Sequence, residues 1–279
     1  MSRRRGALLA TLTFLLASAC GGASPPTSPS PSPTPPALLN IQGDPESPQG
    51  ATWTYRGAFE GVAFDLQGIL LKPLGGGPFP AVIISHGVGG NASSYSLGIA
   101  GEMVRWGLVS IATNYTHAGG VPLGAPGSPI EAGASQSNVQ RAHAVYEILR
   151  LLRYVDMRRV AAHGHSAGAF VTSALVGTYP NDFRVASHTA GGARPDGFGD
   201  AISPSATQVR RIRAPYQLHH AELDALVPLA SAQLFADNLR AAGVPYELHV
   251  YMGAQHNDVA RNDTMFSRVR AWYTAHSLF

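Results

Sequence analysis

The sequence has only one cysteine, Cys20, among its 279 residues. A single thiol cannot form a disulfide within the chain, so the fold must be stable without covalent cross-links. Charge is also sparse, because only 13% of the residues are charged and the formal net charge is +3. Residues 1–19 hold three arginines and no acid, so their removal would bring this charge to zero. A chain with a net charge this close to zero is not expected to bind nucleic acid.

The amino-terminal apolar run, residues 7–17, is too short to span a bilayer. It follows Arg3-Arg4-Arg5 and ends in small residues, which is the pattern of a secretory signal peptide. Its end, Leu16-Ala-Ser-Ala-Cys20, resembles the bacterial lipobox, in which the signal is cut before a cysteine that then carries lipid. We therefore expect an exported cell-envelope lipoprotein anchored at Cys20. The alternative is a secreted soluble protein cut near Ala19.

Composition divides the chain into three parts. Residues 1–19 are the expected signal peptide. Residues 20–50 contain the lipidated Cys20 and a stretch rich in Ser, Thr and Pro, which cannot form a core and favours an extended tether. Residues 51–279 are long enough to bury a full core and form the expected catalytic domain.

From residue 51 onward, apolar runs typical of strands alternate with periodic stretches typical of helices. The expected strands cover residues 51–58, 62–71, 80–85, 108–113, 160–163, 183–187, 216–221 and 246–251. The expected helices cover residues 93–106, 139–152, 167–176 and 229–242, with a last one that ends near residue 276. This order predicts an α/β fold with a mainly parallel, doubly wound sheet and a site at the carboxyl ends of its strands. The Gly- and Pro-rich residues 190–212 leave no room for a large helical lid.

One segment has the spacing of a nucleophile elbow. Gly164-His-Ser-Ala-Gly168 follows an apolar strand and precedes small and apolar residues that suit a helix. In a G-x-S-x-G turn the serine hydroxyl projects above the sheet, and the glycines let the strand and helix pack closely. Ser166 is therefore the candidate nucleophile. An ordinary Gly-Ser turn is the alternative.

A serine hydroxyl needs a base to accept its proton and an acid to orient that base. In an elbow fold of this kind, the acid follows the serine in the chain and the histidine comes last. Downstream, His249 lies within an expected strand and His276 within the last helix, whereas His256 lies in a loop directly after the last strand. We therefore predict that His256 is the base.

Asp224 is the predicted acid, because it lies just beyond the strand at residues 216–221 and its carboxylate can point toward the His256 loop. It would hold the imidazole tautomer and stabilise the imidazolium. Glu222 is the alternative, although it can still belong to the end of the strand. Asp258 is disfavoured because it is too close to His256 in the sequence.

The negative charge that develops on an attacked carbonyl oxygen needs fixed N–H donors. One predicted donor is the backbone N–H of Ala167, directly after the nucleophile. The other is the backbone N–H of Val88, in the loop His86-Gly-Val-Gly-Gly90. The alternative for this loop is a glycine-rich turn without a ligand role. We expect His86 itself to be a structural hydrogen-bonding residue.

Other polar residues near the strand ends have weaker assignments. Tyr115 and His117 lie on a long Gly- and Pro-rich connection, residues 114–134, where they either line the substrate pocket or are plain surface residues. Further histidines at positions 163, 165, 188, 219 and 220 lack the spacing of zinc motifs such as H-E-x-x-H. We expect neither a metal nor a cofactor.

Together these segments resemble an α/β-hydrolase, and within that superfamily the dienelactone-hydrolase-like proteins. Residues 77–90 resemble that family's third strand and oxyanion loop, residues 164–168 its elbow, residues 224–228 its acid turn and residues 253–256 its histidine loop. Dienelactone hydrolases proper use a cysteine nucleophile, whereas Ser166 occupies the elbow here. The resemblance therefore implies a serine carboxylesterase for small-molecule, lipid or polyester esters.

The leading prediction is a serine hydrolase that cleaves carboxylic esters through an acyl-enzyme on Ser166. An acyltransferase would use the same residues, with an alcohol or amine in place of water. A non-catalytic envelope lipoprotein is a third hypothesis, whose expected signature is the loss of a triad residue, yet all three are present. In each case the membrane is contacted only through the lipid anchor. Acyl chain length, leaving group and oligomeric state stay open.

Overall fold

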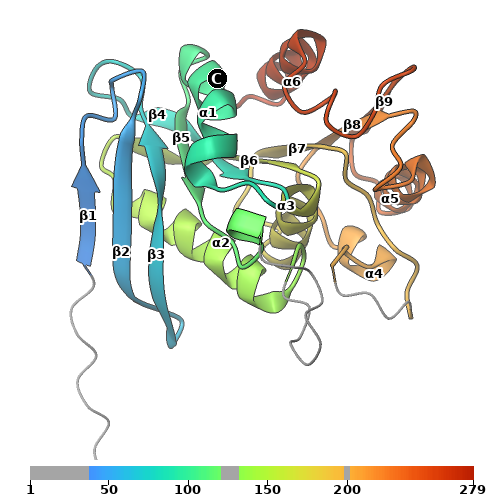
Figure 1. Cartoon of the computed structure of the whole chain (residues 1–279), viewed down its shortest axis with the longest axis horizontal. Coiled ribbons are helices and arrows are strands. Elements are labelled where there is room, and N and C mark those ends of the chain that lie inside the picture. The colour runs from blue at the N-terminus through green and yellow to red at the C-terminus, as the bar shows by residue number, and fades with distance from the viewer. Residues whose placement is uncertain (1–37, 121–131, 198–201) are drawn as a thin grey trace, which may run out of the picture. The chain divides into compact units, whose positions relative to one another are not determined.

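The computed structural model describes residues 38–120, 132–197 and 202–279. The predicted signal peptide and Cys20 lie outside these residues. A nine-stranded sheet in the order β1-β2-β3-β5-β4-β6-β7-β8-β9 is the framework (Figure 1). Its strands are β1 (Leu38–Gln42), β2 (Ala51–Phe59), β3 (Val62–Leu71), β4 (Phe79–Ser85), β5 (Val109–Thr113), β6 (Val155–His165), β7 (Val185–Thr189), β8 (Tyr216–Ala221) and β9 (Tyr246–Tyr251).

The sheet is parallel from β5 to β9, whereas β1, β2 and β3 are joined to it by antiparallel pairing. Its central strands are buried on both faces, which explains why β4 and β5 read as continuous apolar or small-residue runs without alternation. The predicted α/β fold with a mainly parallel sheet is confirmed. All parallel strands end at the same edge, and that edge carries the candidate site.

Helices cover both faces of the sheet (Figure 1). Helices α1 (Leu97–Arg105) and α6 (Asp263–Ala275) pack on one face, in a core that includes Met103 and Trp272. The other face of the sheet is covered by α2 (Gln136–Arg150), α3 (Ala167–Thr178) and α5 (Leu229–Ala241), which contribute to a second core. Within the described ranges, none of the helices is both long and apolar enough to cross a membrane.

The sheet begins earlier than the predicted domain boundary at residue 51. Strand β1 pairs with β2 over the register Leu38 to Arg56 through Gln42 to Thr52, so residues 38–50 belong to the folded unit and not to a tether. The strand is short, lies at the edge of the sheet and alternates exposed with half-buried residues. With only five residues beside a Pro-rich stretch, it is too short to stand out as a strand in the sequence.

Three short helical segments complete the described chain. A π-helix (η1, Ala92–Ser96) leads directly into α1, and a short 3-10 segment (η2, Ala118–Gly120) follows β5. Helix α4 (Ala206–Val209) lies in the stretch predicted to be irregular, where Ser205 and Gln208 form a reciprocal capping box. This four-residue helix is the one regular element among the described residues of 190–212, and it is too small to act as a large lid.

Candidate active site

Ser166 lies at the sharp turn between β6 and α3. Its backbone has φ 55° and ψ −123°, which an L-residue adopts only when the surrounding structure holds it there. The flanking glycines are required by close packing, because a Cβ at Gly164 would overlap the carbonyl oxygen of Gly168 and a Cβ at Gly168 would overlap that of Ser85. The turn therefore lifts the serine hydroxyl above the carboxyl end of β6, as a nucleophile elbow requires.

The three residues predicted as a triad lie within hydrogen-bonding distance of one another. His256 Nε2 is 2.9 Å from Ser166 Oγ, and His256 Nδ1 is 2.7 Å from Asp224 Oδ2. With Nδ1–H donating to the carboxylate, Nε2 is free to accept the proton of the serine hydroxyl. These residues come from the ends of β6, β8 and β9, which are separated by up to 90 positions in the chain.

The Asp224 carboxylate is fixed by the turn in which it lies. Its Oδ1 accepts the backbone N–H groups of Leu226 at 2.9 Å and Val227 at 2.8 Å, which leaves Oδ2 for His256. The side chain is fully buried, so its negative charge acts on the imidazole without much screening by water. A rigid, buried acceptor of this kind keeps the base in one tautomer and one orientation.

The two alternative acids make other contacts. Glu222 Oε2 accepts the backbone N–H of Gly253 at 2.8 Å, and Asp258 Oδ2 accepts that of Gln255 at 2.8 Å. Both bonds stabilise the loop that carries His256, and neither carboxylate reaches the imidazole through any described hydrogen bond. Among these three acids, Asp224 is therefore the one that the structure brings to His256.

The predicted oxyanion loop lies close to Ser166, the candidate nucleophile. A Cβ on Gly87 would come within 3.2 Å of the Ser166 Cβ, so this glycine permits the close approach. Neither Val88 nor Ala167 uses its backbone N–H in a hydrogen bond among the described residues. Donors that are left unpaired beside a nucleophile are suited to an oxyanion, although their assignment to that role stays a prediction.

His86 and His117 support this loop from beneath. His86 accepts the backbone N–H of Tyr115 at Nε2 (3.2 Å) and donates from Nδ1 to Gly87 O (2.9 Å). His117 Nε2 donates to His86 O at 3.0 Å, and the Gly89 N–H donates to His117 O at 3.3 Å. Burial lowers the pKa of His86 to about 4, so it stays neutral and keeps these roles. The expected structural role of His86 agrees with these contacts.

Tyr115 and His117 do not face a substrate pocket. Their exposed fractions are 3% and 1%, and the Tyr115 hydroxyl is bonded to Ser85 Oγ at 2.9 Å. The two rings stack on each other, with a centroid distance of 5.6 Å. The expectation that they line the pocket or the surface is thus corrected, because β5 delivers them beneath the oxyanion loop and not onto its outer side.

Sequence comparison assigns the chain to a family. The model of the dienelactone hydrolase family matches residues 66–279, which include the elbow, the acid turn and the histidine loop. The chain belongs to the dienelactone hydrolase family. No curated protein sequence matches it significantly.

Solved structures share the fold of this family member at low sequence identity. An S-formylglutathione hydrolase from Agrobacterium tumefaciens is 14% identical, with a TM-score of 0.65 over 84% of this chain and 99% of that chain. A thermophilic esterase from Thermogutta terrifontis is 17% identical, with a TM-score of 0.60 over 77% of this chain and 91% of that chain. A puromycin-hydrolyzing peptidase from Mycobacterium tuberculosis is 18% identical, with a TM-score of 0.62 over 86% of this chain and 46% of that chain.

These neighbours include peptidases that are much longer than this chain. It spans less than half the length of the Mycobacterium tuberculosis peptidase, of a candidate dipeptidyl aminopeptidase IV from Bacteroides ovatus and of dipeptidyl peptidase 4 from Porphyromonas gingivalis. Identities in this range show the α/β-hydrolase fold alone. Family membership and the esterase and peptidase neighbours support a serine hydrolase, without deciding between ester and amide substrates.

A residue that sequence reasoning left unassigned connects the elbow to the histidine loop of this dienelactone hydrolase family member. His165, directly before the nucleophile, accepts from Thr189 Oγ1 at Nδ1 (2.8 Å) and donates from Nε2 to Asn257 Oδ1 (3.3 Å). Burial is the main reason that its pKa falls to about 3, so the ring stays neutral beside the base. Its ring centroid lies 5.0 Å from that of His256. His165 is therefore a positioning residue for the loop that carries the base.

Replacing Thr189 by valine tests this positioning role. The isosteric change removes the hydroxyl that is hydrogen-bonded to His165 Nδ1 and holds the ring in place, and we expect kcat to fall about tenfold because the base is then held less firmly. KM should change less than twofold, since Thr189 is fully buried and does not face a substrate. Thr189→Ser keeps the hydroxyl and should restore kcat. Equal kcat values in the valine variant and the parent protein would refute the role.

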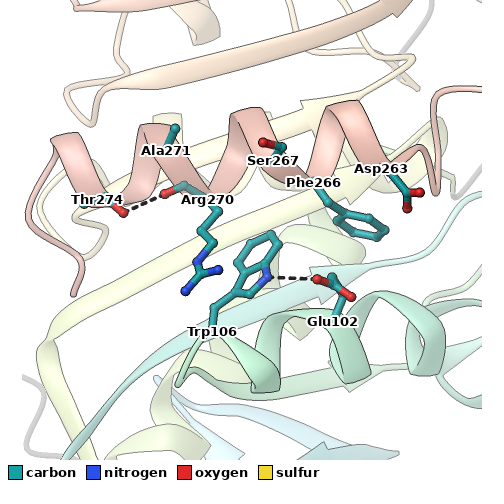
Figure 2. A pocket seen from close by; sticks show the side chains of 8 residues that line it. All are labelled: Glu102, Trp106, Asp263, Phe266, Ser267, Arg270, Ala271 and Thr274. Carbon is teal, nitrogen blue, oxygen red and sulfur yellow. Dashed lines mark hydrogen bonds between the residues drawn. The ribbon is translucent and has the colours of Figure 1, made fainter.

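A cavity of about 510 Å³ lies between α1 and α6 (Figure 2). Figure 2 shows the Glu102 carboxylate turned toward the indole of Trp106, whose Nε1–H donates to it at 3.0 Å. The lining residues are Glu102, Trp106, Asp263, Phe266, Ser267, Arg270, Ala271 and Thr274. This cavity is separate from the candidate active site, because its lining includes none of Ser166, Asp224 and His256.

Proposed function

We propose that this protein is a serine hydrolase that cleaves carboxylic esters through an acyl-enzyme. The observation that carries the proposal is the pair of hydrogen bonds that link Ser166 Oγ to His256 at 2.9 Å and His256 to Asp224 at 2.7 Å. A base that accepts the hydroxyl proton makes the serine oxygen nucleophilic at neutral pH. A structural or purely binding protein would have no use for such a relay.

The reaction proceeds in two halves. Ser166 Oγ attacks the ester carbonyl while His256 Nε2 takes its proton, and the negative oxygen accepts the backbone N–H groups of Val88 and Ala167. The intermediate then collapses, and His256 returns the proton to the departing alcohol. Water next attacks the acyl-enzyme, with His256 as its base, which releases the carboxylic acid and restores Ser166. Throughout, Asp224 keeps Nδ1 of the base protonated.

Two considerations support an ester over an amide. The esterase and the S-formylglutathione hydrolase correspond to this chain over 91% and 99% of their own lengths. The peptidases correspond to it over less than half of theirs. Two neighbours that this chain matches over nearly their whole length are thus an esterase and an S-formylglutathione hydrolase.

Matched substrates test this preference. We expect kcat/KM for p-nitrophenyl butyrate to exceed that for butyryl-p-nitroanilide by at least about a hundredfold, because an aniline leaves only after protonation whereas a nitrophenolate does not. The two substrates share one acyl-enzyme, so the ratio isolates the acylation step. Faster hydrolysis of the anilide would replace the esterase proposal by a peptidase or amidase.

Export and lipid attachment at Cys20 are a further part of the proposal. Three arginines, an apolar run and a lipobox-like end support it. The enzyme would then act on esters outside the cytoplasm, at the surface of the membrane that holds its anchor.

A further inference from the structure

Half of the exposed large apolar side chains among the described residues follow strands that end at the edge of the candidate active site. Among the described residues, eight large apolar side chains are exposed, and four of them are Val88, Leu223, Leu226 and Met252. These four have exposed fractions of 43%, 58%, 72% and 75%, and they lie on loops that follow β4, β8 and β9. Apolar surface of this kind costs free energy in water, and its concentration at one edge marks a binding surface.

Two of these side chains line a groove that begins at the base. The groove has a volume of about 350 Å³ and lies between the acid turn after β8 and the histidine loop after β9. Its lining residues are Leu223, Ala225, Leu226, Gln255, His256, Asn257 and Asp258. His256, one of these lining residues, is hydrogen-bonded to Ser166, so the groove adjoins the candidate base.

The groove is built before any substrate binds. The Leu223 N–H donates to Ala254 O at 2.9 Å, and the Gly253 N–H donates to Glu222 Oε2 at 2.8 Å, so the two loops are tied together. Asp224 holds the other end of its turn through the Leu226 N–H. Leu223 and Leu226 therefore lie on a rigid rim, and binding of a ligand does not carry the free-energy cost of ordering these loops.

The charges of the groove select against anions. Its lining contains no lysine or arginine, and its one carboxylate, that of Asp258, accepts the Gln255 N–H. A ligand that carried a carboxylate would find no opposite charge and would meet a like charge. The uncharged hydrocarbon part of a ligand meets no such repulsion, and its burial against Leu223 and Leu226 stabilises the complex.

The position of the base decides which part of the ester enters. His256 Nε2 must return its proton to the alcohol oxygen, so the alcohol leaves on the His256 side of the serine. We infer that this groove binds the alcohol part of uncharged esters and that Leu223 and Leu226 set a preference for longer alkyl alcohols. The inference rests on the proposed function and adds to it the class of alcohol that leaves.

A series of alkyl butyrates tests the inference. All members form the same butyryl-enzyme, so differences in kcat/KM report binding of the alcohol part during acylation. From ethyl to butyl to hexyl butyrate, we expect kcat/KM to rise about two- to fourfold per methylene that the groove buries. A pentyl butyrate analogue that ends in a carboxylate should be hydrolysed no faster than ethyl butyrate. A wild-type series with no rise would overturn the inference.

The variant Leu223→Ser/Leu226→Ser should flatten the alkyl series to within about twofold, because its groove offers little apolar surface. Its kcat/KM values for p-nitrophenyl acetate, butyrate and hexanoate should keep the wild-type trend, since the acyl chain lies elsewhere. Leu151→Ser is the matched control, as Leu151 is 52% exposed and follows α2, away from the groove.

Three outcomes separate the two proposals. Ser166-dependent hydrolysis in which the double variant keeps the wild-type alkyl trend overturns the groove assignment and leaves the esterase standing. A change in the acyl series in place of the alkyl series also overturns it, because the groove would then hold the acyl chain. Hydrolysis of none of these esters overturns both proposals.

Discussion

Replacing Ser166 by alanine is expected to lower kcat for p-nitrophenyl butyrate by about 10⁴- to 10⁶-fold. The substitution removes the atom that forms the acyl-enzyme, while the base and the oxyanion donors stay in place. Only the weak catalysis that these groups give to direct attack by water should remain. Initial rates at saturating substrate measure the effect.

The matched control is Ser93→Ala, in which an exposed serine of η1 is changed and the rate should stay within twofold of the parent. Unchanged circular dichroism and melting temperature in Ser166→Ala would show that the fold is intact. A Ser166→Ala protein that kept a tenth of the parent kcat would contradict the mechanism.

Mild acid is expected to unfold this protein. Burial lowers the pKa of His86 and His163 to about 4 and that of His165 to about 3, against an ordinary value of 6.5. Below pH 6.5 these histidines are therefore protonated in the unfolded chain but stay neutral in the folded one. Stability is complete above pH 6.5 and falls as the pH drops toward 4.

The size of this effect follows from the number of histidines. Each contributes a loss of about 1.4 kcal/mol per pH unit once the pH is well below 6.5, so these three together contribute about 4 kcal/mol per unit. Burial also lowers the pKa of His188 and His219, which adds to the slope. Since folded domains have a total stability of only about 5–15 kcal/mol, we expect unfolding before pH 4 is reached. Urea titrations at pH 7.5, 6.5, 5.5 and 4.5 measure the slope.

His163→Gln provides the control for the acid prediction. It removes one buried titrating ring, so the slope below pH 6 should fall by about 1.4 kcal/mol per pH unit even if stability is lower at every pH. A wild-type free energy of unfolding that stayed constant between pH 7 and pH 5 would show that these histidines are protonated in the folded state.

The residues of the candidate triad can be predicted from the sequence because local chemistry restricts where they can lie. An elbow needs glycines two residues before and two after its serine, and the acid and base must follow strands that end at the same edge. Ser166, Asp224 and His256 satisfied these restrictions, and the structure brings them together by hydrogen bonds. Buried strands such as β4 were equally clear, since their apolar runs have no polar interruption.

Other features depend on packing that a single sequence does not express. Strand β1 is half exposed and gains its place only by pairing with β2. Tyr115 and His117 are polar residues on a long connection, yet they are buried beneath the oxyanion loop by contacts with Ser85 and His86. The bond between His165 and Asn257 joins positions 92 residues apart, and no spacing rule predicts it.

Covalent labelling by a fluorophosphonate, followed by peptide mapping, tests the central claim most directly. The reagent reacts with serines that a neighbouring base has activated, so the account predicts one phosphonyl group per chain, on Ser166. The acid-denatured protein and the His256→Ala variant should remain unlabelled under the same conditions, because each lacks the relay that activates the hydroxyl. A native protein that stayed unlabelled, or that carried the group on another serine, would contradict the account.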